Sequence, residues 1–95
     1  MTDQEPALTF STFVFSLLHT TAVHLGDAAD PHTGEAGAVN LDAAQHMIDI
    51  LGILEEKTRG NLTAEERQLL EQGLYTLRMR FLEVKKDGGP RIIVP

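Results

Sequence analysis

Two histidines, His19 and His24, lie in the apolar segment of residues 10–26 and are the first candidates for metal chemistry. Imidazole is a common zinc ligand, but two ligands on one helix need a spacing of three or four residues. A spacing of five turns the two rings about 140° apart around a helix, so they cannot hold one ion together. We expect His24 to be a hydrogen-bonded packing residue and His19 to lie at the surface.

The segment of residues 26–40 offers a second candidate for a cation site, because it is rich in carboxylate oxygens. Its acidic residues lack the spacing of an EF-hand loop. A solvated turn built on the sequence DPHTG is the favoured interpretation, and we expect neither a metal nor a cofactor. The side chains that would form the site are Asp27, Asp30, His32 and Glu35.

Acid-base and nucleophilic catalysis are not indicated by the sequence. The carboxylates of the predicted helices fall on polar faces, and Ser11 and Ser16 have no neighbouring base at a workable spacing. No glycine-rich phosphate loop of the P-loop kind occurs. We therefore expect a protein that is not an enzyme. The alternative, a metal-dependent enzyme that uses the loop, would be tested by metal analysis.

The composition favours a small protein that acts through other proteins. The chain has 95 residues, no cysteine and a net charge of −6, so a single domain without disulfides is expected. A chain of this size buries only about 60 to 65% of the surface that its unfolded form exposes, which favours a dimer. The acidic charge argues against nucleic acid and anionic membranes as partners.

The location expected from the sequence is the cytoplasm. The N-terminal sequence MTDQEPALT is acidic and does not resemble a secretory signal. The apolar segment that follows is too short for a membrane span, which needs about 20 apolar residues, and it is interrupted by polar side chains.

Apolar periodicity predicts an all-α fold, with an αα-hairpin formed by the second and third of three helices. Thr9 or Ser11 can cap the first helix, Asn40 the second, and Thr63 with Glu66 forms a capping box for the third. A long loop, residues 26–40, joins the first two helices. The predicted helices are residues 11–25, 41–58 and 64–84; the predicted domains are a flexible N-terminus 1–8, a helical domain 9–86 and a flexible tail 87–95.

The apolar arc of the first helix is wider than one neighbouring helix can cover. We expect the other two helices to bury part of it and a second copy of the chain to bury the rest. The residues predicted to mediate this self-association are Phe10, Phe13, Val14, Leu17 and Leu18.

The third helix has two apolar faces. One is the expected core stripe, in which Gly73 could mark a close approach of another helix. On nearly the opposite side Tyr75, Met79 and Leu82 line up at spacings of four and three residues, rimmed by Arg78. We predict that these four residues bind a partner protein. Two alternatives stay open: the stripe is buried within a homo-oligomer, and the nearby cations only complement the helix dipole.

Several motifs of the chain resemble the RomX-like family of short bacterial proteins, a family known as a domain of unknown function. The likeness covers about residues 9–82. It is carried by FSTFVFSLLHTTAVHLG, by DPHTG in the loop, by NLDAAQHMIDILGILEEKTRGNLTAEERQLL and by LYTLRMRF. The sequence from residue 83 onward is not part of this likeness.

This resemblance implies an adaptor in bacterial cell polarity or signalling. The polarity regulator of the family joins a response-regulator-like protein, RomR, to the Ras-like GTPase MglA and promotes nucleotide exchange. Such a protein needs no catalytic side chain, because tighter binding to one nucleotide state shifts the population of that state. The alternative function is a structural homo-oligomeric helical module without a GTPase partner.

Overall fold

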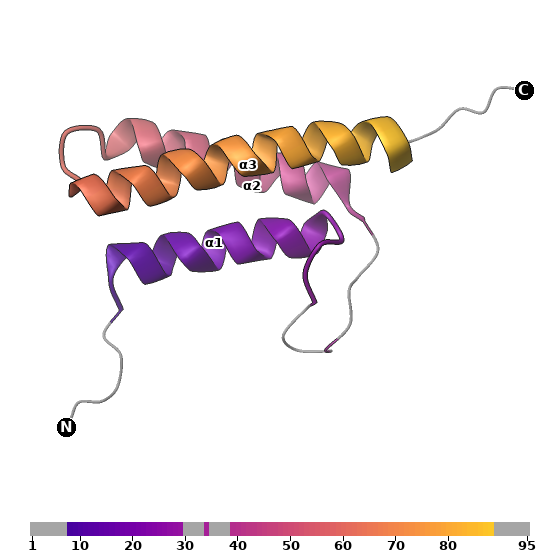
Figure 1. Cartoon of the computed structure of the whole chain (residues 1–95), viewed down its shortest axis with the longest axis horizontal. Coiled ribbons are helices and arrows are strands. Elements are labelled where there is room, and N and C mark those ends of the chain that lie inside the picture. Colours follow the sequence, from indigo (N-terminus) through magenta and orange to yellow (C-terminus); the bar gives the residue numbers. More distant parts are fainter. Residues whose placement is uncertain (1–7, 30–33, 35–38, 89–95) are drawn as a thin grey trace, which may run out of the picture.

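The computed structural model describes residues 8–29, 34 and 39–88 and has the predicted all-α architecture. Helix α1 (Phe10–His24) runs in one direction, α2 (Leu41–Lys57) returns, and α3 (Ala64–Gly88) runs parallel to α1 (Figure 1). Every pair of helices is in contact, and α2 and α3 form the predicted antiparallel hairpin. The chain is therefore a small three-helix bundle.

The start of each helix is fixed by a local capping interaction. Thr9 caps α1 in a capping box with Thr12, and the Asn40 side chain accepts a hydrogen bond from the backbone N–H of Ala43 at the start of α2. At α3 the Glu66 N–H donates to the Thr63 hydroxyl at 3.1 Å, and the Thr63 N–H donates to the Glu66 carboxylate at 2.9 Å. The predicted caps at Asn40 and Thr63 are confirmed.

The end of α3 differs from the prediction. The helix continues through Gly88 instead of ending near Val84, so residues 87 and 88 belong to it and not to a tail. Lys85 and Lys86 are good helix formers and complement the dipole of the last turn, and α3 ends at Gly88, the first of the helix breakers Gly88, Gly89 and Pro90. Residues 1–7 and 89–95, most of the predicted flexible ends, lie outside the described residues.

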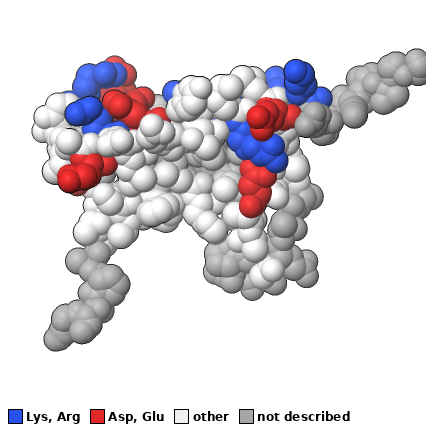
Figure 2. All heavy atoms as spheres, viewed as in Figure 1, with Lys and Arg blue, Asp and Glu red and all other residues white. Residues whose placement is uncertain are grey.

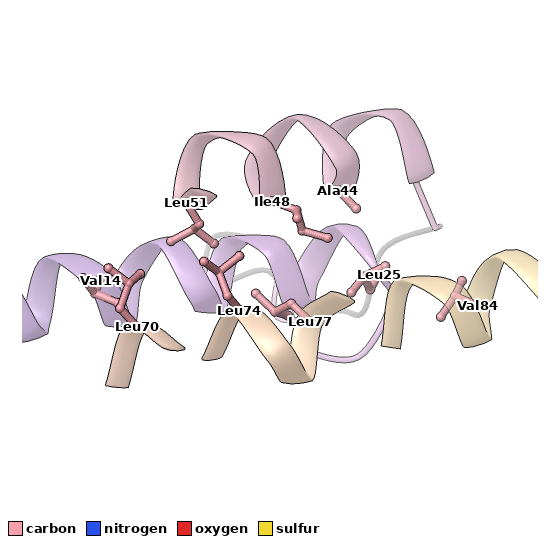
Figure 3. Close-up of a cluster of buried hydrophobic side chains, with 9 residues drawn as sticks. All are labelled: Val14, Leu25, Ala44, Ile48, Leu51, Leu70, Leu74, Leu77 and Val84. Carbon is pink, nitrogen blue, oxygen red and sulfur yellow. The ribbon is translucent and has the colours of Figure 1, made fainter. Parts of the chain in front are cut away.

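The core between the helices consists of aliphatic side chains (Figure 3). Each helix contributes residues at helical spacing, so that one face of each points inward. The one buried polar residue among those described, Thr21, donates its hydroxyl hydrogen bond to the Leu17 carbonyl at 2.8 Å. The buried hydrophobic residues are Val14, Leu25, Ala44, Ile48, Leu51, Leu70, Leu74, Leu77 and Val84.

Gly73 allows α1 and α3 to approach closely, as the sequence indicated. A Cβ atom at this position would lie 2.6 Å from Cδ1 of Leu18 and 2.7 Å from its Cδ2. These distances are far shorter than a van der Waals contact, so the Leu18 side chain occupies the space that any larger residue would need.

We predict that Gly73→Val lowers the free energy of unfolding by about 1 to 3 kcal/mol, because the added atoms overlap Leu18. Chemical denaturation measures the loss. In a Leu18→Ala background the same substitution should cost clearly less, since the shortened side chain makes room. An equal loss in both backgrounds would show that the contact does not set the distance between the helices.

Candidate protein interface

The stripe predicted on the third helix lies on the outer surface of α3. The exposed fractions of Tyr75, Met79 and Leu82 are 64, 45 and 57%. The core residues Leu74 and Leu77 lie on the other side of the same helix and are buried. The single chain therefore leaves this stripe open to a contact.

Arg78 lies beside the stripe and reaches across to α2. Its terminal nitrogen lies 3.3 Å from the position that a Cβ atom would take at Gly52. Because Gly52 has no side chain, the guanidinium can lie over the α2 backbone. The structure thus brings the four predicted partner-binding residues together on one side of the hairpin.

The five residues of α1 that were expected to mediate self-association differ in their exposure. Val14 is fully buried within the bundle, so a second copy cannot reach it, and this residue is a correction to the prediction. Leu17, Leu18 and Phe10 are half-buried and pack against the core. Phe13 remains exposed, with its ring centroid 6.5 Å from that of Phe10.

Two large apolar residues are exposed although the sequence analysis did not single them out. Phe15, which belongs to the wide apolar arc of the first helix, is 61% exposed, and Ile53 is exposed on the outer face of α2. Phe15 lies about 100° around the helix from Val14, at the edge of the apolar arc. Its place in the arc does not determine whether another helix of the bundle covers it. The exposure of Ile53 could have been predicted, because polar residues surround it on its face of α2.

No aromatic side chain of this protein belongs to the fully buried core. The sequence has four phenylalanines, one tyrosine and no tryptophan. Phe10 and Phe81 are partly buried at the margin of the core, while Phe13, Phe15 and Tyr75 are exposed. Aromatic side chains carry much of the binding energy of protein interfaces. Their position at the margin of the core or on the surface leaves aromatic area for contacts with other molecules.

Charged residues gather at the two ends of the face seen in Figure 2, and the surface between them carries few charges. Helix α1 contains no Asp, Glu, Lys or Arg, in a chain whose net charge is −6. Beside it, a shallow apolar groove between α1 and α3 is lined by Leu18, Leu69, Gln72, Gly73, Thr76 and Leu77.

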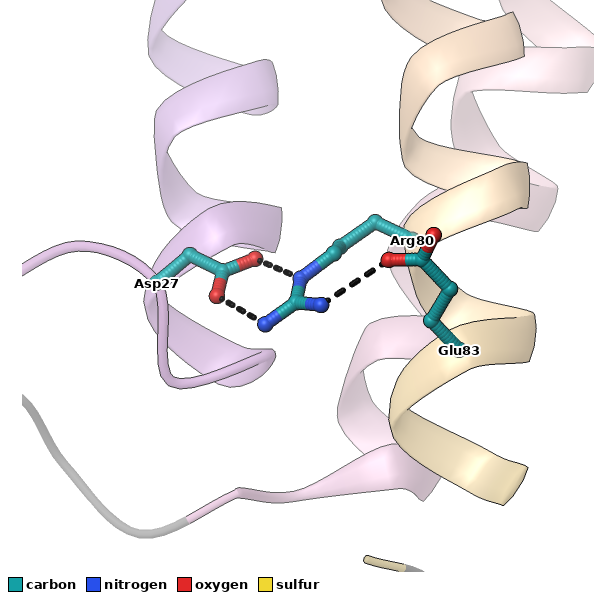
Figure 4. A network of polar contacts seen from close by, with 3 residues as sticks. All are labelled: Asp27, Arg80 and Glu83. Atoms are coloured by element: carbon teal, nitrogen blue, oxygen red, sulfur yellow. Dashed lines mark hydrogen bonds and ion pairs between the residues drawn. The ribbon is translucent and has the colours of Figure 1, made fainter. Parts of the chain in front are cut away.

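A bidentate ion pair fixes the beginning of the long loop to α3 (Figure 4). Arg80 donates from Nε and Nη2 to the two carboxylate oxygens of Asp27, at 2.7 and 2.8 Å, and from Nη1 to Glu83 at 2.9 Å. These hydrogen bonds and the charge of Arg80 hold the pKa of Asp27 below its usual value, against a smaller opposing effect of burial. The pKa of Arg80 is raised by the same contacts.

The other end of the loop is held close to the first by the backbone. The Asn40 N–H donates to the His24 carbonyl at 2.8 Å, so the segment leaves and re-enters the bundle at nearly one place. Gly26, with φ of 83°, makes the left-handed turn that ends α1. The loop therefore has a fixed base, which sequence analysis did not anticipate because Asp27 and Arg80 are 53 residues apart.

The candidate metal ligands are not brought together within the part of the chain that the structure describes. His19 is exposed, His24 is half-buried, and the Asp27 carboxylate is engaged by Arg80. Among the described residues, no three histidine or carboxylate side chains are grouped to hold an ion. Asp30, His32 and Glu35 lie outside these residues.

The fold and its surfaces define a small three-helix domain with exposed apolar faces, and no helix within its described ranges is long and apolar enough to cross a membrane. The chain belongs to the family described as a domain of unknown function, DUF1844, whose sequence model matches residues 7–83. Membership of such a family, expected from the sequence motifs, is thereby confirmed. Comparison with curated proteins and with solved structures gave no match.

We predict that Asp27→Asn destabilises the protein at neutral pH and that the effect disappears in acid. An aspartate whose folded-state pKa is lowered stabilises the fold above its unfolded-state pKa of about 3.9, and this contribution is lost as the pH falls through the lower value. Because the pair is partly exposed, the effect is small. Thermal denaturation of both proteins across this pH range measures it.

Glu83→Gln is the matched control, since it removes one carboxylate charge that makes a single hydrogen bond to Arg80. It should change the melting temperature less than Asp27→Asn does. A difference between wild type and Asp27→Asn that stays constant with pH would contradict the assignment.

Proposed function

We propose that this protein is a non-enzymatic, cytoplasmic adaptor in bacterial cell polarity or signalling. In this role it links a response-regulator-like protein to a Ras-like small GTPase and helps nucleotide exchange. The observation that carries the proposal is the placement of the aromatic side chains: none is in the fully buried core, and Tyr75 is exposed in an apolar stripe with Met79 and Leu82. The likeness of the sequence to the RomX-like family supports the choice of partners.

The proposed mechanism requires contact surfaces and no reacting group. An adaptor that binds one nucleotide state of a GTPase more tightly than the other shifts the equilibrium by the difference in binding free energy. A rigid helical surface suits this task, because little conformational entropy is lost when it binds. The stripe of Tyr75, Met79 and Leu82 lies in the middle of α3, which both other helices hold in place.

We predict that Tyr75→Ala combined with Met79→Ala weakens binding to a Ras-like GTPase by about 2 kcal/mol or more, the scale of interface hot spots. Titration calorimetry with the GTPase bound to GDP or to a GTP analogue measures the loss. Because both side chains are exposed in the single chain, stability should change by only about 0.5 kcal/mol per substitution.

Ile53→Ala is the matched control for this experiment. Ile53 is a similarly exposed apolar residue, but it lies on α2 and outside the stripe. It should leave GTPase binding unchanged. If the double variant loses much of its stability or its oligomeric mass while the protein that remains folded binds the GTPase like the wild type, the stripe belongs to the assembly of the protein with itself.

The second candidate function is a homo-oligomeric structural module, and the uncharged surface of α1 favours it. Two copies that each carry a charge of −6 repel each other least where they meet through a face without formal charge. Exposed Phe13 and Phe15 on the two flanks of α1 offer apolar area for such a contact.

We predict that the free protein is a dimer or larger, and that Phe13→Gln combined with Phe15→Gln yields a monomer with intact helices. Light scattering at micromolar concentration and circular dichroism measure mass and helicity. Ile53→Gln, which removes a similarly exposed apolar side chain from α2, should leave the mass unchanged. A wild-type protein that is already monomeric under these conditions would refute self-association.

A further inference from the structure

A groove between α2 and α3 combines an apolar floor with charged edges. Ile48 of α2 and Phe81 of α3 line the floor, and Leu82 of the partner-binding stripe lines the same groove. The groove therefore continues the exposed stripe of α3 towards α2. A ligand that covers the stripe would also enter it.

Two cations stand along the α3 edge of this groove. Arg78 and Lys85 are seven residues apart, so they lie on the same side of the helix, about 10.5 Å apart along its axis. Lys85 lies over the Phe81 ring, with its amino nitrogen 6.0 Å from the ring centroid. Both cations are thus placed beside the apolar floor.

These two cations differ from Arg59 and Arg80, whose guanidinium groups are engaged by carboxylates. Arg59 and Arg80 form ion pairs with Glu56 and Asp27. Within the described part of the chain, neither Arg78 nor Lys85 has a carboxylate oxygen within 4.0 Å. In a chain with 14 acidic and 8 basic residues, two cations without a carboxylate contact among the described residues leave positive charge for a ligand.

The α2 edge of the groove has the opposite sign. Asp49 lines it and accepts a hydrogen bond from the side-chain amide of Gln45 at 2.9 Å. The groove therefore receives positive charge from two α3 side chains, of which Arg78 reaches over Gly52 of α2, and negative charge from Asp49 of α2. This polarity favours one orientation of a ligand over the reverse.

We propose that this groove binds an amphipathic helix of a partner protein, which carries two carboxylates seven residues apart that pair with Arg78 and Lys85. The inference rests on the proposed function, since it requires a protein partner. Apolar residues three and four positions after the first carboxylate lie between the two ion pairs and cover Phe81 and Leu82.

The spacing of the cations selects a helix over an extended segment. Seven helical residues span about 10.5 Å and return to the same face. In a strand, residues on one face recur every two positions, or about 6.6 Å, so same-face carboxylates are separated by about 6.6 or 13.2 Å. Only a helical ligand therefore repeats the seven-residue register of Arg78 and Lys85 along α3.

The test uses a lactam-bridged helical peptide of about 18 residues, a length at which a helix can be held in water. It carries two glutamates seven residues apart, with leucines at the third and fourth positions between them. A second peptide of the same composition has its glutamates five residues apart, on different faces. Fluorescence anisotropy should show that the first peptide binds the full-length protein and that the second binds about tenfold more weakly or worse.

The variant Arg78→Glu with Lys85→Glu should lower the affinity for the first peptide by about tenfold or more, as expected for two partly exposed charge pairs. It should in turn bind a peptide in which the two glutamates are replaced by lysines. Arg67→Glu with Lys86→Glu changes the net charge equally, but both residues are exposed and outside the groove, so binding should stay within about twofold. Circular dichroism checks that the variants fold; Arg78→Gln with Lys85→Gln is the milder second variant.

If the groove variant and the control variant lower the affinity for the first peptide equally, the peptide is held by general electrostatic attraction and the proposal is overturned. Equal binding of the two glutamate peptides, or no binding of either, would also overturn it. A change of oligomeric mass in the groove variant would assign the groove to a second copy.

If the first peptide binds as expected while a Ras-like GTPase and a response-regulator-like protein do not, the groove stands and the proposed function fails. If those proteins bind through Tyr75 but the peptide does not, the function stands and the groove assignment fails.

Discussion

The narrow aliphatic core shared by three helices constrains the rest of this protein. Side chains such as Val14, Leu51 and Leu74 are fully buried, and Gly73 lets Leu18 fit between α1 and α3. A core built of leucine, isoleucine, valine and alanine permits close helix spacing, but it leaves no room for the larger rings. The phenylalanines and the tyrosine are therefore placed at the margin or on the surface. The apolar surface of the bundle follows from the way its core is packed.

Local interactions made the helices predictable, while contacts distant in sequence were not. Asn40 and the Thr63–Glu66 pair fix helix starts through atoms at most three residues apart, so their types and spacing were sufficient. The extra turn of α3 was missed because the lysine pair was treated as the end of the helix, whereas the backbone continues until stronger breakers follow. The ion pair of Asp27 with Arg80 leaves no periodic signal at a separation of 53 residues.

The exposed stripe of α3 was predictable because the periodicity of one helix separates its two faces. Tyr75 and Met79 lie opposite the core stripe in any bundle that buries Leu74 and Leu77. The surface of α1 was less predictable. Its apolar arc is too wide for periodicity to tell which part α2 and α3 cover, so Val14 and Phe15 could be separated only when all three helices were in place.

The cations of α3 look alike in the sequence but have different surroundings, because they lie on different flanks of the helix. Arg80 is on the flank that meets the end of α1, where Asp27 occupies its guanidinium. Arg78 is on the flank that meets α2, where Gly52 lets it lie over the backbone. Met79 lies between these flanks, and Gln72, seven residues earlier on the same face, lines the groove beside α1. The surface offered to a second copy and the surface offered to a partner thus adjoin along α3. Burial of this shared edge by either proposed contact would change the area left to the other, so the proposed self-association and the proposed partner binding are expected to be coupled.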